Sequence, residues 1–77
     1  MRLEEIIKRI DFGDDVAFEC GGRHFVVCPT PEGCDIAESR TEKDRAVYPD
    51  GETLVNEYMI DGKSIKQRIE EIRLENC

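Results

Sequence analysis

Two adjacent glycines, Gly21 and Gly22, constrain the fold of this chain more than any other feature of its sequence. The run before them, VAFEC (16–20), alternates apolar and polar residues, and the run after them, RHFVVC (23–28), is rich in β-forming residues. A two-residue loop of glycines between two such runs is typical of a tight β-hairpin. We therefore predict a hairpin in which Cys20 lies opposite Arg23 and the pairing continues to Val16 opposite Val27.

This register divides the hairpin into two faces, because successive side chains of a strand point to opposite sides of the sheet. We expect one face to be mainly apolar and to lie against the core, and it carries Val16, Phe18, Cys20, Phe25 and Val27. The other face carries Ala17, Glu19, His24, Val26 and Cys28.

A third strand is predicted over CDIAES (34–39), after a four-residue loop from Thr30 to Gly33. This loop length places Ile36 opposite Val27 on the apolar face, whereas a shift of one residue would place Asp35 there. The segment 39–44 is predicted to be a polar connection. AVY (46–48) is then a short fourth strand.

Three helices are predicted around this meander. At the N-terminus, apolar residues with spacing i, i+3, i+4 and i+7 form one helix face that ends at Asp11 and Gly13. Asp50 is expected to cap a short second helix, and Asp61-Gly62 to break it. Ser64 or Asp61 is expected to cap a final helix that carries Ile65, Ile69 and Ile72 on one stripe.

The predicted fold is therefore a single α+β domain over residues 1–77, since a chain of this length supports only one core. It has an N-terminal helix, a three- to four-stranded antiparallel meander and two C-terminal helices packed on one sheet face. The expected core consists of Leu3, Ile6, Ile10, Val16, Phe18, Phe25, Val27, Ile36, Leu54, Ile65, Ile69 and Ile72.

The cysteines and the one histidine raise the question of a metal or redox site. A zinc site needs four ligands that converge on one ion, but the predicted register places Cys20 on one face of the hairpin and His24 and Cys28 on the other. Cys34 returns to the face of Cys20. We therefore predict no metal, cofactor or catalytic site, and expect Cys20 and Cys34 to act as small buried apolar residues. A metal-binding or redox module is retained as the alternative.

Charge is the strongest functional signal in the sequence. The net charge is −7, and the segment 32–57 holds eight acids and three bases, which gives −5 of that charge. This balance disfavours direct binding to nucleic acid and to anionic membranes. It fits a surface that only keeps the protein soluble, and it also fits a face that docks on a basic protein partner. The candidate interface, which includes one aromatic anchor, consists of Glu32, Asp35, Glu38, Glu42, Asp44, Tyr48, Asp50, Glu52 and Glu57.

The second half of the chain, from Ala46 to Ile72, resembles small uncharacterised proteins of Firmicutes, their phages and mobile elements. The resemblance rests on PDGETLVNEYMIDGKSIKQRIEEI, and above all on the IDGK-Ser-hydrophobic segment from Ile60 to Ile65. It implies a β-meander followed by an acidic turn, a short helix and a last amphipathic helix. In size, acidity and element order the chain is also similar to some anti-CRISPR proteins, which bind a nuclease in place of DNA.

These observations predict a non-enzymatic interaction protein. Its most specific form is an inhibitor that binds a basic nucleic-acid-handling protein such as a nuclease. A self-associating structural protein, such as a homodimer, is the other alternative because the core is small. The sequence shows neither a secretory signal nor the ~20 apolar residues of a membrane span, so we expect a cytoplasmic protein with reduced thiols.

Overall fold

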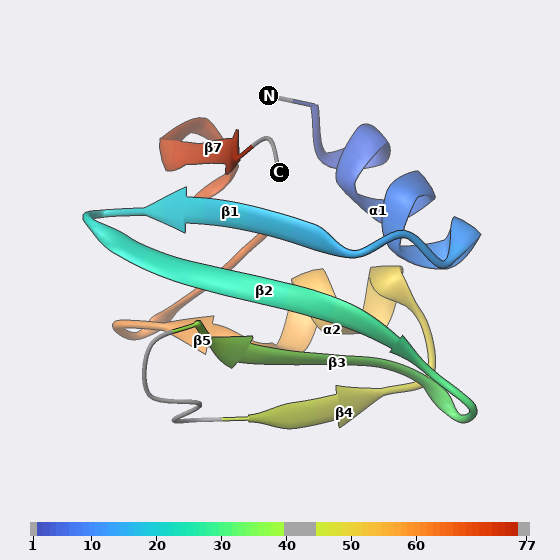
Figure 1. Ribbon diagram of the computed structural model, residues 1–77. Helices are drawn as coiled ribbons and strands as arrows, with labels where there is room; N and C mark the ends of the chain where they lie inside the picture. Colours follow the sequence, from blue (N-terminus) through green and yellow to red (C-terminus); the bar gives the residue numbers. More distant parts are fainter. Residues whose placement is uncertain (1, 40–44, 76–77) are drawn as a thin grey trace.

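The computed structural model of the protein describes residues 2–39 and 45–75 and shows an α+β architecture (Figure 1). Its largest element is a five-stranded antiparallel sheet with the strand order β4-β3-β2-β1-β7. The five strands are β1 (Val16–Cys20), β2 (Arg23–Thr30), β3 (Gly33–Glu38), β4 (Ala46–Tyr48) and β7 (Ile72–Glu75). The remaining elements are α1 (Leu3–Phe12), α2 (Gly51–Glu57), the two-stranded hairpin β5 (Met59–Ile60) and β6 (Lys63–Ser64), and the 3-10 helix η1 (Ile69–Glu71).

The predicted hairpin register is confirmed. Cys20 pairs with Arg23, and the ladder runs to Val16 opposite Val27. The predicted register of the next hairpin is confirmed as well, since Ile36 pairs with Val27. The loop is shorter than predicted, because the ladder continues to Thr30 opposite Gly33 and leaves only Pro31 and Glu32 between the strands. Gly33 begins β3 with a φ of 147°, and a side chain there would meet the backbone oxygens of Tyr48 and Pro49, so only glycine fits between β3 and the end of β4.

The two α-helices lie on the same face of the sheet, which we call the inner face (Figure 1). The N-terminal helix is confirmed, and Gly13 ends it in the left-handed conformation. The first residue of α2, Gly51, approaches α1 closely: a Cβ atom there would lie 3.1 Å from the backbone oxygen of Ile7. Of the twelve expected core residues, ten are buried, and Leu3 and Ile69 are partly buried at its rim.

The C-terminal part of the chain corrects the predicted fold. Among the described residues, α2 is the one α-helix after the meander, and no α-helix spans Ile65, Ile69 and Ile72, since only the short 3-10 helix η1 contains Ile69. Ser64 does begin a helical turn, because its hydroxyl accepts a hydrogen bond from the backbone N–H of Gln67 (3.1 Å) while the Gln67 side chain accepts one from the N–H of Ser64 (2.9 Å). The turn ends after Arg68, and after η1 the chain becomes extended at Ile72.

The extended segment is the fifth strand, β7, which the meander prediction lacked. It pairs with β1 along the edge that the β1–β2 hairpin leaves open, with Phe18 opposite Leu74 and Cys20 opposite Ile72. Its alternation of apolar and charged residues matches a strand with one buried side: Ile72 is 3% exposed and Leu74 packs against the core. The strand satisfies backbone groups of β1 that a C-terminal helix would leave unpaired.

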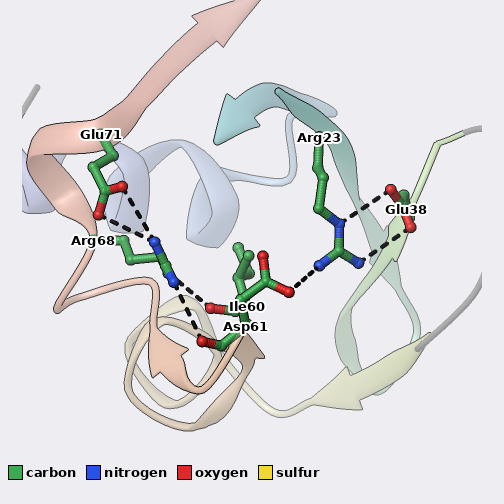
Figure 2. A network of polar contacts seen from close by, with 6 residues as sticks. All are labelled: Arg23, Glu38, Ile60, Asp61, Arg68 and Glu71. Carbon is green, nitrogen blue, oxygen red and sulfur yellow. Dashed lines mark hydrogen bonds and ion pairs between the residues drawn. The ribbon is translucent and has the colours of Figure 1, made fainter. Parts of the chain in front are cut away.

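Two arginines hold the β5–β6 turn in place (Figure 2). Arg23 of β2 donates to the carboxylate of Asp61 (2.9 Å) and pairs with Glu38 (3.2 Å). Arg68 donates to the backbone oxygen of Ile60 (2.7 Å) and to that of Asp61 (3.3 Å), and it also pairs with Glu71. The turn needs this support because Asp61 adopts a positive φ of 51°.

We predict that Arg68→Ala lowers the free energy of unfolding by about 1–3 kcal/mol, because it leaves the backbone oxygen of the buried Ile60 without its donor. Chemical denaturation measures the change. Lys66→Ala is the matched control: Lys66 is an exposed cation in the same turn, and its removal should change stability by less than about 0.5 kcal/mol. Equal losses in the two variants would contradict the assigned role of Arg68.

Candidate functional site: an acidic pole

Six exposed carboxylates meet at one end of the sheet, which lies on the right in Figure 1. They come from three connections: the end of α1, the β2–β3 turn and the β4–α2 connection. The segments 10–15, 29–34 and 49–53 contain no Lys, Arg or His. We call this set the acidic pole, and it consists of Asp11, Asp14, Asp15, Glu32, Asp50 and Glu52.

The fold brings these segments together through specific contacts. Asp11 at the end of α1 accepts a hydrogen bond from the backbone N–H of Gly51 (2.8 Å), which joins α1 to the start of α2. Because Val16 pairs with Val27, Asp14 and Asp15 lie at the end of the sheet where β2 runs into the β2–β3 turn. A shallow cleft of about 250 Å³ lies among the three connections, and Asp11, Thr30 and Asp50 line it.

Asp50 has a structural role in addition to its charge. Its carboxylate accepts a hydrogen bond of 2.7 Å from the backbone N–H of Thr53, as predicted for the N-cap of α2. Hydrogen bonds with the side chain and the backbone N–H of Thr53 stabilise the ionised form, so the pKa of Asp50 lies below its usual value. The carboxylate is therefore held negative at the start of α2, beside the charge of Glu52.

An exposed aromatic ring stands in the pole. Phe12, the last residue of α1, is 83% exposed although it follows the buried Ile10 by only two positions. Phe12 lies outside the apolar stripe of α1, so nothing in the core accounts for its ring. Phenylalanine is among the residues that are enriched at protein interfaces relative to the rest of the surface.

The structure separates the residues of the sequence-predicted interface. Three of its acids, Glu32, Asp50 and Glu52, lie in the acidic pole. Asp35 is on the opposite, outer face of the sheet and pairs with Arg45 (2.7 Å), and Glu38 pairs with Arg23 at the far end of the sheet. Glu57 is exposed at the last turn of α2.

The predicted aromatic anchor is only partly available. Tyr48 is half-buried and stacks edge-on against Tyr58, which is itself buried. Glu42 and Asp44 lie outside the described residues.

The segment-based charge count missed Asp11, Asp14 and Asp15, and it missed Phe12. The sequence contains these residues in the run DFGDD, which has no basic residue. Only the pairing of the strands shows that this run lies beside the other two connections.

The cysteines and His24 lie as the hairpin register predicted. Cys20 and Cys34 are buried on the inner face, while His24 and Cys28 lie on the outer face. The ring Nδ1 of His24 lies 3.0 Å from the carboxylate of Glu75. Among residues 2–39 and 45–75, no three His, Cys, Asp or Glu side chains are grouped so that they could hold a metal ion.

Burial shapes the chemistry of the described thiols. Desolvation is the main cause that raises the pKa of Cys20, Cys28 and Cys34, and nearby carboxylates raise it further. All three thiols are therefore less ionised at neutral pH than an exposed cysteine, and the thiolate is the nucleophile. Burial and a raised pKa are typical of cysteines that have a structural role.

No protein-family model matches the chain, and neither a curated protein nor a solved structure matches it. No helix among the described residues is long and apolar enough to cross a membrane.

We predict that the folded protein protects its thiols unequally. At neutral pH, iodoacetamide should modify the half-buried Cys28 first and leave Cys20 and Cys34 unmodified until the protein unfolds. Peptide mapping by mass spectrometry over a time course measures the three rates, and the same experiment in denaturant should make them equal. Modification of Cys20 or Cys34 at the rate of Cys28 in the folded protein would contradict the inner-face assignment.

We also predict that Asp50 makes stability fall in acid. A carboxyl group whose pKa is lower in the folded state stabilises the protein above its unfolded pKa of about 3.9, and this stabilisation is lost as the pH falls through the lower folded value. Asp50→Asn keeps an N-cap oxygen but cannot titrate. Urea denaturation from about pH 6 to pH 2 should show a smaller loss for Asp50→Asn than for the original protein, whereas parallel losses would contradict the prediction.

Proposed function

We propose that the protein is a non-enzymatic interaction module that acts in the cytoplasm and binds a basic protein through its acidic pole. The observation that carries the proposal is the grouping of six exposed carboxylates from three base-free connections. The rest of the described surface has a mixed composition, with ion pairs such as Arg23–Glu38 and Arg45–Asp35. The net charge of −7 therefore acts mainly at one end of the molecule.

A concentrated charge of this kind steers association and selects partners of opposite sign. Phe12 is exposed between Asp11 and the pair Asp14–Asp15. Its ring would lose contact with water when a partner binds, at the centre of the interface. The carboxylates supply charge to the rim, and the ring supplies the anchor. Together they fit a basic surface with an apolar recess.

The most specific form of the proposal is an inhibitor of a nucleic-acid-handling enzyme. Such enzymes bind phosphates through Lys and Arg, so a compact group of carboxylates competes for the same groove. The general similarity to small acidic anti-CRISPR proteins supports this choice, and so does the resemblance to phage and mobile-element proteins. Binding of this type weakens steeply as salt is raised.

The test is competition with DNA. A panel of purified nucleases, including RNA-guided ones, is loaded with a fluorescein-labelled DNA duplex, and the displacement of the duplex by this protein is followed by anisotropy at low and high salt. We expect displacement from at least one nuclease at low salt and a large loss of affinity at high salt. Displacement from no member of the panel at low salt would contradict the proposal in its inhibitor form.

Two variants of equal net charge locate the interface. The pole variant combines Asp14→Asn, Asp15→Asn, Glu32→Gln and Glu52→Gln, and it spares the two acids with structural hydrogen bonds. The control combines Glu4→Gln, Glu5→Gln, Glu57→Gln and Glu70→Gln, which are exposed acids outside the pole. We expect the pole variant to bind at least about tenfold more weakly than the control, since each lost contact contributes a few tenths of a kcal/mol. Equal losses would show that the total charge, and not the pole, governs binding.

A further inference from the structure

The sheet has two edges, and they differ in how well they are protected. Edge strand β4 has three residues and is followed by Pro49, and short length and proline both hinder further pairing. Edge strand β7 has four residues and no proline. One side of β7 pairs with β1, so its other side presents backbone N–H and C=O groups that pair with no strand among residues 2–39 and 45–75.

We propose that β7 is a self-association surface, on which the β7 strand of a second copy pairs in the antiparallel direction about a two-fold axis at Leu74. The pairing joins the two five-stranded sheets into one continuous sheet. Symmetric pairing of this kind is the simplest closed arrangement for two identical strands.

The side chains of β7 select this register. In an antiparallel pair, directly opposite residues lie on the same face of the sheet, so Arg73 can face only Arg73 or Glu75 of the partner subunit. An axis at Arg73 or at Glu75 places like charges opposite each other, which destabilises the pair. An axis at Leu74 brings the two Leu74 side chains together. On each side of this contact, Arg73 of one copy lies opposite Glu75 of the other, so two ion pairs form.

The charged groups are available for this pairing. Arg73 lies opposite Glu19 of β1, yet it makes no ion pair or side-chain hydrogen bond with any residue that the structure describes. Glu75 contacts His24 on the outer face of the sheet, but its side chain is 40% exposed. A carboxylate accepts several hydrogen bonds, so Glu75 can bind His24 and an arginine at the same time.

The position of the acidic pole also favours the two-fold arrangement. Glu75 pairs with Ala17 at the start of β1, so β7 ends on the side of the sheet where the pole lies. Rotation about Leu74 places the pole of the second copy at the opposite end of the joined sheet. The two concentrations of negative charge are thus kept far apart, which limits their repulsion.

The test is sedimentation equilibrium of the full chain over a range of concentrations, with a reducing agent that excludes disulfide-linked dimers. We expect a reversible monomer–dimer equilibrium, weak because the interface is small. Arg73→Glu and Glu75→Arg should each weaken dimerisation at least about tenfold, since each substitution creates two like-charge pairs. Circular dichroism of each variant checks that the fold is retained.

The double variant Arg73→Glu/Glu75→Arg is the decisive sample, because it exchanges the two charges and restores the complementary pattern. We expect it to dimerise as the original protein does. A protein that stays monomeric up to about 1 mM, the affinity of the weakest specific complexes, overturns the proposal, and so does a double variant that stays as weak as the single ones. Val47→Lys on the β4 edge is the control, and loss of the dimer in that variant alone would assign the interface to β4.

Discussion

The arrangement of the molecule depends on β1, which pairs with β2 on one side and with β7 on the other. Phe18 lies at its centre, 1% exposed, with Phe25 opposite it in one ladder and Leu74 in the other. The rings of Phe18 and Phe25 stack with centroids 5.4 Å apart, and Phe25 contacts Tyr58 edge-on. A one-residue shift of register would place apolar side chains of one strand on the solvent face, so the two pairings of β1 fix the core as well as the sheet.

The part of the fold that is encoded locally was predictable from the sequence. Gly21-Gly22 sets the hairpin register, and the choice between Ile36 and Asp35 for the apolar face sets the next loop. The C-terminal segment was not predictable in the same way, because the spacing of Ile65, Ile69 and Ile72 fits a helix and also fits a turn followed by a strand. The open edge of β1 decides between the two, and this edge exists only once the hairpin has formed. The Ser64–Gln67 pair begins a helix that tertiary structure then stops.

The candidate site shows the same division between local and tertiary information. Counting charge along the chain identified the acidic middle segment but not its geometry. Asp35 and Glu38 in that segment are paired with arginines, whereas Asp11, Asp14 and Asp15 join the pole from a distant part of the sequence. Antiparallel strands place connections that are distant in sequence at the same end of a sheet, so the pole appears only when the strand order is known. Phe12 was overlooked because a helix-terminal aromatic residue gives no sign in the sequence of being exposed.

Nuclear Overhauser contacts across β1 and β7 are the decisive measurement for the pairing of these two strands. The account predicts backbone contacts between Phe18 and Leu74 and between Glu19 and Arg73, together with slow amide exchange in β1. It also predicts that contacts between residues four apart, which are typical of an α-helix, stop at Arg68, because η1 is a 3-10 helix. A continuous series of such helical contacts from Ser64 to Ile72, without contacts to β1, would contradict the account, because β1 would then be an edge strand and the end of the sheet would be built differently.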